Sequence, residues 1–246
     1  MAIIGGFVVA QASKITIHSG TSDQAVVKGL QGMALPIGAT ASTISISTIG
    51  QRIGIKVATG LEYDPISTTY YFAKGDPTQQ YLMKCSREGT QIQDMWFWID
   101  GDDFAALDKI NDPGGYVMIG TFGAPTAQKN EVYTGSVETV IAGSHIFFDR
   151  HIGGTTLSFT AGGPGVDAQV TDSGNGFVTA GFKTGDTVIL TNVDGMDPLY
   201  AKVATVAAGA MTFEDGVGDE ATIPTFTGIS TTRIHGAEPI EVIDTF

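Results

Sequence analysis

The stretch of sequence that decides the fold predicts a short helix with clear ends: Asp76-Pro-Thr-Gln-Gln-Tyr-Leu-Met-Lys-Cys-Ser-Arg-Glu-Gly89. The opening aspartate is a favourable N-cap, and the proline after it occupies the first helical position, where its missing N–H costs nothing. The final glycine can adopt the left-handed conformation that ends a helix. Tyr81, Leu82 and Cys85 are expected to share the buried face of this helix.

Strand patterns lie on both sides of the helix. Ile44 and Ile46 alternate with polar residues, and Ile53, Ile55 and Val57 do the same. This period of two is typical of strands with one buried face. We therefore expect a mostly β chain, with further strands at residues 69–72, 96–99, 116–119, 132–141 and 145–148 and a helical turn within residues 103–110.

The bulk composition agrees with a folded β protein. Of the 246 residues, 42% are hydrophobic and 33 are glycines, which suits many tight turns between short strands. No apolar run is long enough to span a bilayer. The single cysteine, Cys85, excludes an intrachain disulfide framework.

The net charge of −13 is distributed unevenly along the chain. Residues 1–152 contain 14 acidic and 10 basic residues, a net −4, whereas residues 153–246 contain 12 and 3, a net −9. The basic residues form no stripe, which disfavours tight nucleic-acid binding. Aromatic residues also become fewer after Gly153 and Gly154. We therefore expect two domains, residues 1–152 and 153–246, the second being a small β-sandwich or barrel.

The order of these features resembles the tail tube proteins, or major tail proteins, of long-tailed bacteriophages with flexible tails. A threonine-rich strand at residues 45–48 is followed by a Gly60-Leu61 turn, an aromatic strand, the helix opened by Asp76-Pro-Thr-Gln79, and Trp96-Phe-Trp-Ile99. The segment Ala10-Gln-Ala-Ser-Lys-Ile-Thr-Ile17 is similar to the family's opening strand, although the family often has glycine after the Ala-Gln pair. The resemblance covers roughly residues 10–150, and residues 171–188 resemble a small β module of phage virion proteins.

The resemblance implies a β-sandwich or half-barrel core, six subunits to a ring, and rings stacked into a tube whose inner sheet closes across subunits. It implies passive conduction of DNA during ejection, without catalysis, cofactor or metal. The implied partners are identical subunits, the tape measure protein, and the tail terminator and tail-tip proteins, with no membrane. DNA would pass only transiently and non-specifically. The implied location is the virion tail, after assembly in the host cytoplasm.

Six residues are candidates for subunit contacts: Ile3, Ile4 and Phe7 of an apolar N-terminal arm, Leu82 of the helix, and Trp96 and Trp98. The two tryptophans point to one face of their strand, and Phe97 and Ile99 point to the other. A strand that is apolar on both faces must be covered on both, either by the helix or by another subunit.

The wall of a tube would need a surface to which DNA does not stick. A wall of negative charge has this property because it repels the phosphate backbone. Glu62, Asp100 and Glu138 lie on or beside expected strands and are the candidates for this lumen. The C-terminal domain, which follows a Gly-Gly hinge, is expected to be dispensable for tube formation.

No pattern in the sequence indicates catalysis or a metal centre. There is no zinc-ligand spacing, nucleophile elbow or phosphate-binding loop. The unit Gly162-Gly-Pro-Gly-Val-Asp167 occurs once, whereas calcium sites of this type need tandem copies. The acidic loop at residues 214–220 is either a cation site or, more commonly for such a loop, a solvated turn.

Two other functions stay open from the sequence. A capsid decoration protein would also be acidic and rich in β structure and glycine, but it would form trimers on a shell. A carbohydrate-binding tail fibre or adhesin module would use Trp96 and Trp98 as a stacking platform on an exposed face.

Overall fold

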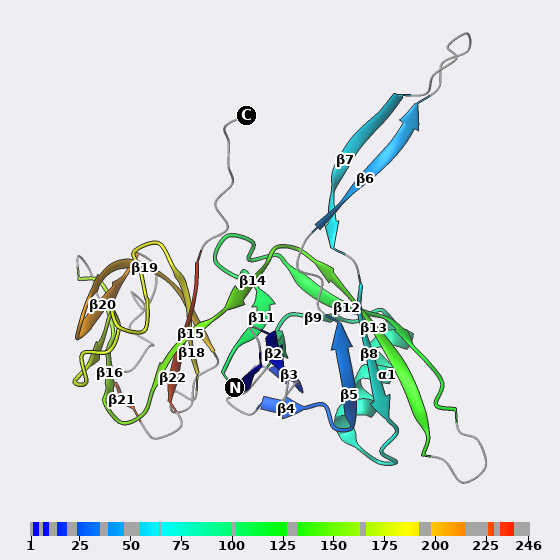
Figure 1. The fold of residues 1–246 in the computed structure, drawn as a ribbon, viewed down its shortest axis with the longest axis horizontal. Coiled ribbons are helices and arrows are strands. Elements are labelled where there is room, and N and C mark those ends of the chain that lie inside the picture. Colours follow the sequence, from blue (N-terminus) through cyan, green and yellow to red (C-terminus); the bar gives the residue numbers. More distant parts are fainter. Residues whose placement is uncertain are drawn as a thin grey trace. The chain divides into compact units, whose positions relative to one another are not determined.

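The fold is known from a computed structural model, which describes residues 2–4, 7–9, 14–18, 24–34, 39–46, 55–63, 65–99, 102–126, 132–162, 166–191, 198–214, 226–228 and 232–238. Within these ranges the chain is mostly β, with strands β1 to β22 and the single helix α1, as the sequence predicts (Figure 1). None of the described residues forms a helix that is long and apolar enough to cross a membrane.

The chain forms two compact units, each built from segments that are far apart in the sequence. One unit consists of Met1–Val27, Ile92–Tyr116 and Gly143–Phe246, and the other of Lys28–Gln91 and Val117–Ala142. Strand β15 (Arg150–Gly153) crosses the expected boundary between residues 152 and 153 and pairs with β22 (Arg233–Ala237). The division into domains 1–152 and 153–246 stays a prediction.

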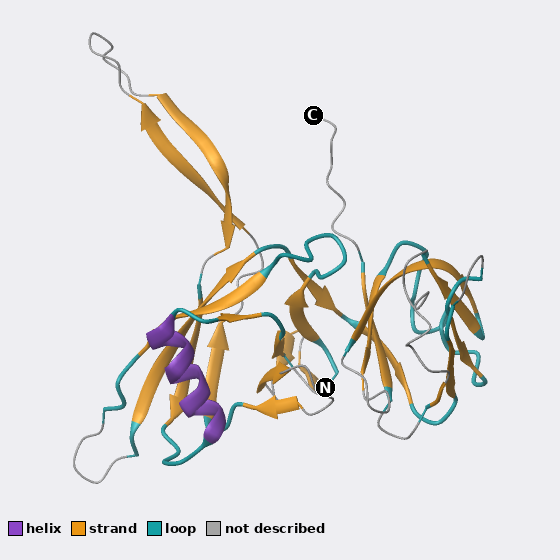
Figure 2. Ribbon diagram, turned by 180° about the vertical axis from the view of Figure 1, so that it is seen from behind, coloured by secondary structure: helices purple, strands orange, loops and turns teal. Residues whose placement is uncertain are grey.

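The second unit contains a five-stranded sheet, here called the helix sheet, with one helix across one of its faces (Figure 2). Its strands lie in the order β5 (Leu30–Ala34), β8 (Ile66–Tyr71), β13 (Thr134–Ala142), β12 (Tyr116–Phe122) and β9 (Gln91–Ile92). Buried and exposed residues alternate along β8 and along the middle of β13. The helix α1 (Pro77–Glu88) covers the buried face, and among the described residues the other face is left open.

Both ends of α1 are formed by the residues that the sequence predicts. The Asp76 carboxylate accepts hydrogen bonds from the backbone N–H groups of Thr78 and Gln79, at 3.1 and 3.0 Å. Gly89 has φ 64°, in the left-handed region, and its N–H donates to the carbonyl of Cys85. These contacts satisfy backbone groups that a helix otherwise leaves unpaired at its ends.

The packed face of α1 agrees with the prediction except at one position. Leu82 and Cys85 are buried, together with Gln79, but Tyr81 is 41% exposed. Each residue turns the helix by about 100°, so Tyr81 lies to one side of the stripe that contains Leu82 and Cys85. The expectation that Tyr81 shares the buried face is therefore wrong.

The first unit contains a second five-stranded sheet, here called the tryptophan sheet. Its strands lie in the order β14 (His145–Phe148), β11 (Phe104–Leu107), β10 (Met95–Trp98), β3 (Lys14–His18) and β4 (Gln24–Val26). The helical turn expected within residues 103–110 is instead the strand β11, all of whose residues are buried. The strand pairs with β10 and β14, and these tertiary contacts outweigh the local helical preference of Ala105 and Ala106.

Eight further strands of the first unit form an antiparallel sheet, here called the C-terminal sheet. Its order is β15, β22, β18 (Thr187–Thr191), β19 (Leu199–Ala207), β20 (Ala210–Phe213), β17 (Gln169–Asp172), β16 (Leu157–Thr160) and β21 (Phe226–Thr227). Phe159 and Ile234 come from strands near opposite ends of this order, yet they share one buried cluster. The sheet therefore folds back on itself around a core, as expected for a small sandwich or barrel.

Candidate assembly surfaces

The face of the helix sheet that α1 leaves open is polar and rich in hydroxyl groups. Its exposed residues in the two central strands are Ser67, Thr69 and Tyr71 of β8 and Ser136, Glu138 and Val140 of β13. Ser67 lies opposite Glu138, and Thr69 lies opposite Ser136. Glu138 is the only charged residue in the sequences of β8 and β13, so this face carries one negative charge among hydroxyl groups.

The helix sheet ends on both sides in strands that pair on one side only. Among the described residues, no strand pairs with the outer side of β5 or of β9. Such edges present unpaired N–H and C=O groups, and these can form hydrogen bonds with a strand of another chain. The sheet can therefore be extended at both edges without a change in its interior.

Two hairpins pair only with themselves in the part of the chain that the structure describes. Strands β6 (Ala39–Ile46) and β7 (Ile55–Tyr63) form one of them, as the sequence predicts for both segments. Strands β1 (Ala2–Ile4) and β2 (Phe7–Val9) form the other, at the position of the expected apolar arm. An isolated two-stranded hairpin is only marginally stable in water, so each hairpin would gain stability from a further surface.

Strand β10, which contains both tryptophans, is covered by other strands of the same chain. An apolar cluster, here called the aromatic seam, joins the tryptophan sheet to the C-terminal sheet: Trp96, Trp98, Phe104, Ala106, Ile146 and Phe148 pack with Ile189, His235 and Ala237. Trp96 is fully buried and Trp98 is 5% exposed. The expectation that the helix or a second subunit covers the tryptophan face of β10 is therefore wrong, because strands β18 and β22 cover it.

Polar groups hold the seam together at its border. The hydroxyl of Tyr200 donates to the Asp94 carboxylate at 2.5 Å, and Nε1 of Trp96 donates to the same oxygen at 3.0 Å. Nε1 of Trp98 donates to the hydroxyl of Thr16 at 2.9 Å. Burial raises the pKa of Tyr200 well above its ordinary value, and the charge of Asp94 raises it further. The tyrosine therefore stays a protonated donor, and both indole N–H groups have the partner that buried tryptophans need.

The six candidates for subunit contacts fall into two classes. Leu82, Trp96 and Trp98 are buried inside the subunit. Ile3 and Ile4 lie in β1 and Phe7 in β2, in a hairpin that pairs with no other described strand. A role of these six residues in subunit contacts stays a prediction. The three buried residues could affect such contacts only indirectly, by supporting the folded structure of the subunit.

The three lumen candidates lie in different places. Glu138 is on the open face of β13 and is exposed. Glu62 lies in β7, where the structure does not describe side chains. Asp100 lies outside the described residues. Their position in a lumen stays a prediction.

The sequence did not indicate a partly buried ion cluster around Arg150. Its guanidinium contacts the Asp186 carboxylate at 2.7 Å and that of Glu238 at 2.9 Å, and Lys183 contacts Glu238 at 3.1 Å. Asp186 is 1% exposed. The cluster joins β15 to the end of β22 and to the turn before β18. Arg150 is 36 residues from Asp186 and 88 from Glu238, so no local pattern could have indicated the contact.

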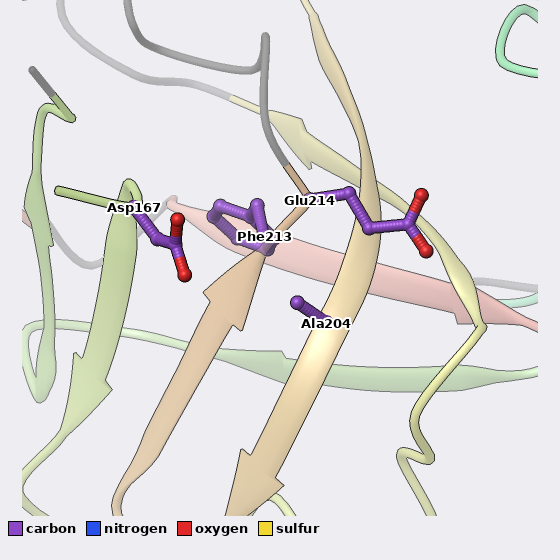
Figure 3. Close-up of a pocket in the computed structure, with 4 residues that line it drawn as sticks. All are labelled: Asp167, Ala204, Phe213 and Glu214. Carbon is purple, nitrogen blue, oxygen red and sulfur yellow. The ribbon is translucent and has the colours of Figure 1, made fainter. Parts of the chain in front are cut away.

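A hollow in the C-terminal sheet offers no arrangement of ligands for a cation. It has a volume of about 460 Å³ and is lined by Asp167, Ala204, Phe213 and Glu214 (Figure 3). The Glu214 carboxylate pairs with Lys202 at 2.9 Å and points away from Asp167. Residues 215–220 of the acidic loop lie outside the described ranges. Within those ranges, no three acidic, histidine or cysteine side chains gather as metal ligands would.

No protein-family model and no curated protein matches this chain. Several solved structures resemble part of it. A chain of the virion of a native gene transfer agent particle has 12% sequence identity and a TM-score of 0.40, over 57% of this chain and 98% of that one. A chain of the tail of an empty gene transfer agent particle, with C6 symmetry, has 13% identity and a TM-score of 0.39, over 55% and 93%.

A third structure, the six-fold symmetrised baseplate of the anti-feeding prophage, contains a chain with 8% identity and a TM-score of 0.38. The match covers 58% of this chain and 97% of that one. These scores and identities are too low to establish a shared fold or function. In each case nearly the whole of the other chain is matched by little more than half of this one.

Proposed function

We propose that this chain is a virion structural protein, the subunit of a phage tail tube, which polymerises as stacked hexameric rings into a passive conduit for DNA ejection. The observation that carries the proposal is the helix sheet, which has α1 on one face, a polar open face and two unpaired edges. A sheet of this kind can continue into the sheets of its neighbours, and a ring of such sheets has no free edge. The well-formed helix also matches the element at the centre of the resemblance to tail tube proteins.

The two hairpins are the proposed contacts between subunits and between rings. The β6–β7 hairpin is long enough to reach a neighbouring subunit, since it pairs from Ala39 and Tyr63 out to Ile46 and Ile55. The β1–β2 hairpin consists of Ala-Ile-Ile and Phe-Val-Val, which makes it apolar on both faces. Such a hairpin favours a dry surface over water. We therefore assign Ile3, Ile4 and Phe7 to a subunit contact.

The open face of β8 and β13 is the proposed inner wall of the tube. Ser67, Thr69 and Ser136 would present hydroxyl groups that water also satisfies, and Glu138 would form one ring of carboxylates per ring of subunits. Hydroxyl groups and negative charge give the phosphate backbone no cation to pair with, so DNA would pass without sticking. Glu62 and Asp100 are further candidates for the same wall.

The C-terminal sheet is proposed to lie on the outside of the tube, as part of a domain at residues 153–246. The tape measure protein, the tail terminator and the tail-tip proteins are the other proposed partners, and the role requires no catalysis. The carbohydrate-binding alternative loses its basis at Trp96 and Trp98, because a stacking platform must be exposed and both rings are buried.

Electron microscopy of a hairpin deletion tests the proposal. Replacing residues 39–63 by a short glycine–serine linker should leave the fold intact, because the described part of this hairpin pairs only with itself. Wild-type protein at high concentration, seeded with tail tips, should form tubes of stacked rings, and the deletion should form none. A matched control, Val178→Ser at an exposed turn, should assemble normally. Wild-type protein that forms only discrete trimers would support a decoration protein instead.

A further inference from the structure

The aromatic seam contains a buried histidine, His235, whose surroundings favour the neutral imidazole over the protonated form. His235 of β22 is 2% exposed. The centre of its ring lies 5.0 Å from that of Phe104 and 5.9 Å from that of Trp98, and both aromatic rings meet it nearly edge to face. An imidazole is therefore inserted among the side chains that join the C-terminal sheet to the tryptophan sheet.

The hydrogen bonds of this ring fix its charge. One ring nitrogen is hydrogen-bonded to the backbone of Asp102. The other, Nδ1, is buried and has no hydrogen-bond partner in the part of the chain that the structure describes. A neutral imidazole needs only one donor contact, so this arrangement suits the neutral ring. A proton on Nδ1 would place an unpaired cation in an apolar cluster.

The groups around His235 offer the added charge little compensation. His151 lies opposite it in β15, with the ring centres 6.2 Å apart, and Arg233 belongs to the same strand. Lys14 of β3 lies 4.3 Å over the ring of Trp98. The carboxylate of Asp102, before β11, is 3.7 Å from His151, and the Asp94 carboxylate is held by Tyr200. Burial lowers the pKa of His235 to about 3, and the positive charges of its neighbours contribute.

We propose that His235 makes the aromatic seam an acid-sensitive joint: a proton on its Nδ1 separates the C-terminal sheet from the tryptophan sheet, while each sheet keeps its own strands. The reason is that opening the seam exposes the ring to water, where both nitrogens can be protonated and hydrated. This joint is independent of the role as a tube subunit, because every group it uses lies within one chain.

The direction of the effect follows from the binding of protons. In the open seam His235 has an ordinary pKa of about 6.5, and in the closed seam it has a pKa of about 3, so only the open form takes up the proton between these values. The stability of the closed seam is complete above pH 6.5 and falls progressively as the pH decreases toward 3. Between pH 7 and pH 5 the ratio of open to closed seam should rise about 25-fold.

The two tryptophans make the seam directly observable. The chain contains only two, and both Trp96 and Trp98 lie in the seam. Wild-type protein is titrated from pH 7 to pH 4.5, and tryptophan emission is recorded beside far-ultraviolet circular dichroism. We expect a red shift in emission with an unchanged dichroism spectrum. His235→Phe, which cannot take up a proton, should abolish the shift, whereas His151→Gln, at a 40% exposed side chain, should retain it.

Three results would overturn the proposal: no red shift down to pH 4.5, an equal shift in His235→Phe, or loss of strand signal together with the shift. Because the phenylalanine variant could fail to fold, acrylamide quenching of tryptophan emission in the wild-type protein provides a second measurement. Both indole rings are buried in the closed seam, so quenching should increase between pH 7 and pH 5. Backbone amide exchange in β10, β11, β18 and β22, corrected for the intrinsic effect of pH, should stay unchanged because each strand keeps its hydrogen bonds, and faster exchange in all four strands would contradict a local joint.

Discussion

The aromatic seam and the open face of the helix sheet show two different outcomes for a sheet face. In the seam, an apolar face of the tryptophan sheet is covered by strands of the same chain, and Trp96 and Phe104 are completely buried. On the helix sheet, α1 covers one face, and the other carries hydroxyl groups and Glu138. In these two regions, the apolar faces of the sheets are therefore buried within the same chain. What these regions leave for other molecules is polar surface and strand edges, which are the contacts that the proposed assembly requires.

Removing the C-terminal sheet should have the largest effect, because it takes away the strands that cover the tryptophan sheet. The sequence alone predicts that residues 1–152 assemble by themselves, whereas the structure shows that the tryptophan sheet would then lose the cover of β18 and β22. Truncation uncovers the apolar side chains of the seam as one contiguous patch, and such a patch associates readily with other copies of the chain. We expect residues 1–152 to be insoluble. Solubility and circular dichroism would check this, and a soluble truncated chain that forms tubes would show that the seam is dispensable.

Leu82→Asp is the next largest expected effect, because it tests the covered face of the helix sheet. Leu82 is 1% exposed, and a carboxylate there would have to be buried or would separate α1 from the sheet. A loss of about 3–5 kcal/mol in the free energy of unfolding is expected. Tyr81→Asp, at the exposed neighbouring position, should cost less than about 1 kcal/mol. Equal urea midpoints for the two variants would contradict the packing of this face.

Asp76→Ala removes the N-cap and should have a smaller effect. The carboxylate satisfies two backbone N–H groups, so its loss should cost about 1 kcal/mol. Asp76→Asn keeps the capping oxygen without the charge and should retain most of the stability. Thermal unfolding of the three proteins separates capping from charge, and a loss as large for asparagine as for alanine would assign the effect to charge, including the pair with Lys28.

Glu138→Lys should have the smallest effect on stability, and it directly tests the proposed role of the open face. Because the residue is exposed, the free energy of unfolding should change by less than about 0.5 kcal/mol. If the face lines the tube, DNA ejection should slow, and most at low ionic strength, where the attraction between lysine and phosphate is least screened. Glu138→Gln separates the loss of negative charge from the gain of positive charge. Unchanged ejection at every salt concentration would remove Glu138 from the wall.

Local signals in the sequence predicted local structure well. The ends of α1 depend on residues within one turn, and the cap at Asp76 and the left-handed Gly89 are both present. The mostly β class follows from period-two patterns that each lie within one strand. Position 81 marks the limit of such reasoning, since the width of a buried stripe depends on the surface against which the helix packs.

Contacts between segments far apart in the sequence could not be predicted from the single sequence. The Trp96 strand showed that both of its faces needed cover, but nothing indicated that β18 and β22 would supply it. The helical preference of Ala105 and Ala106 gave way to pairing with β10 and β14. Asp186 and Glu238, two of the three described partners of Arg150, are likewise distant in the sequence, and charges scattered along a chain do not show which of them meet.

The position of β22 has a consequence for the order of folding during synthesis. It lies between β15 and β18 in the C-terminal sheet, although it is the last described strand along the chain. Until residues 233–237 have left the ribosome, β15 has no partner in its sheet and Trp98 lacks the His235 ring that covers it. The nascent chain therefore carries an uncovered aromatic surface for most of its synthesis. Exposed apolar surface of this kind promotes aggregation, so the yield of soluble protein should depend on how quickly translation reaches the last described strand.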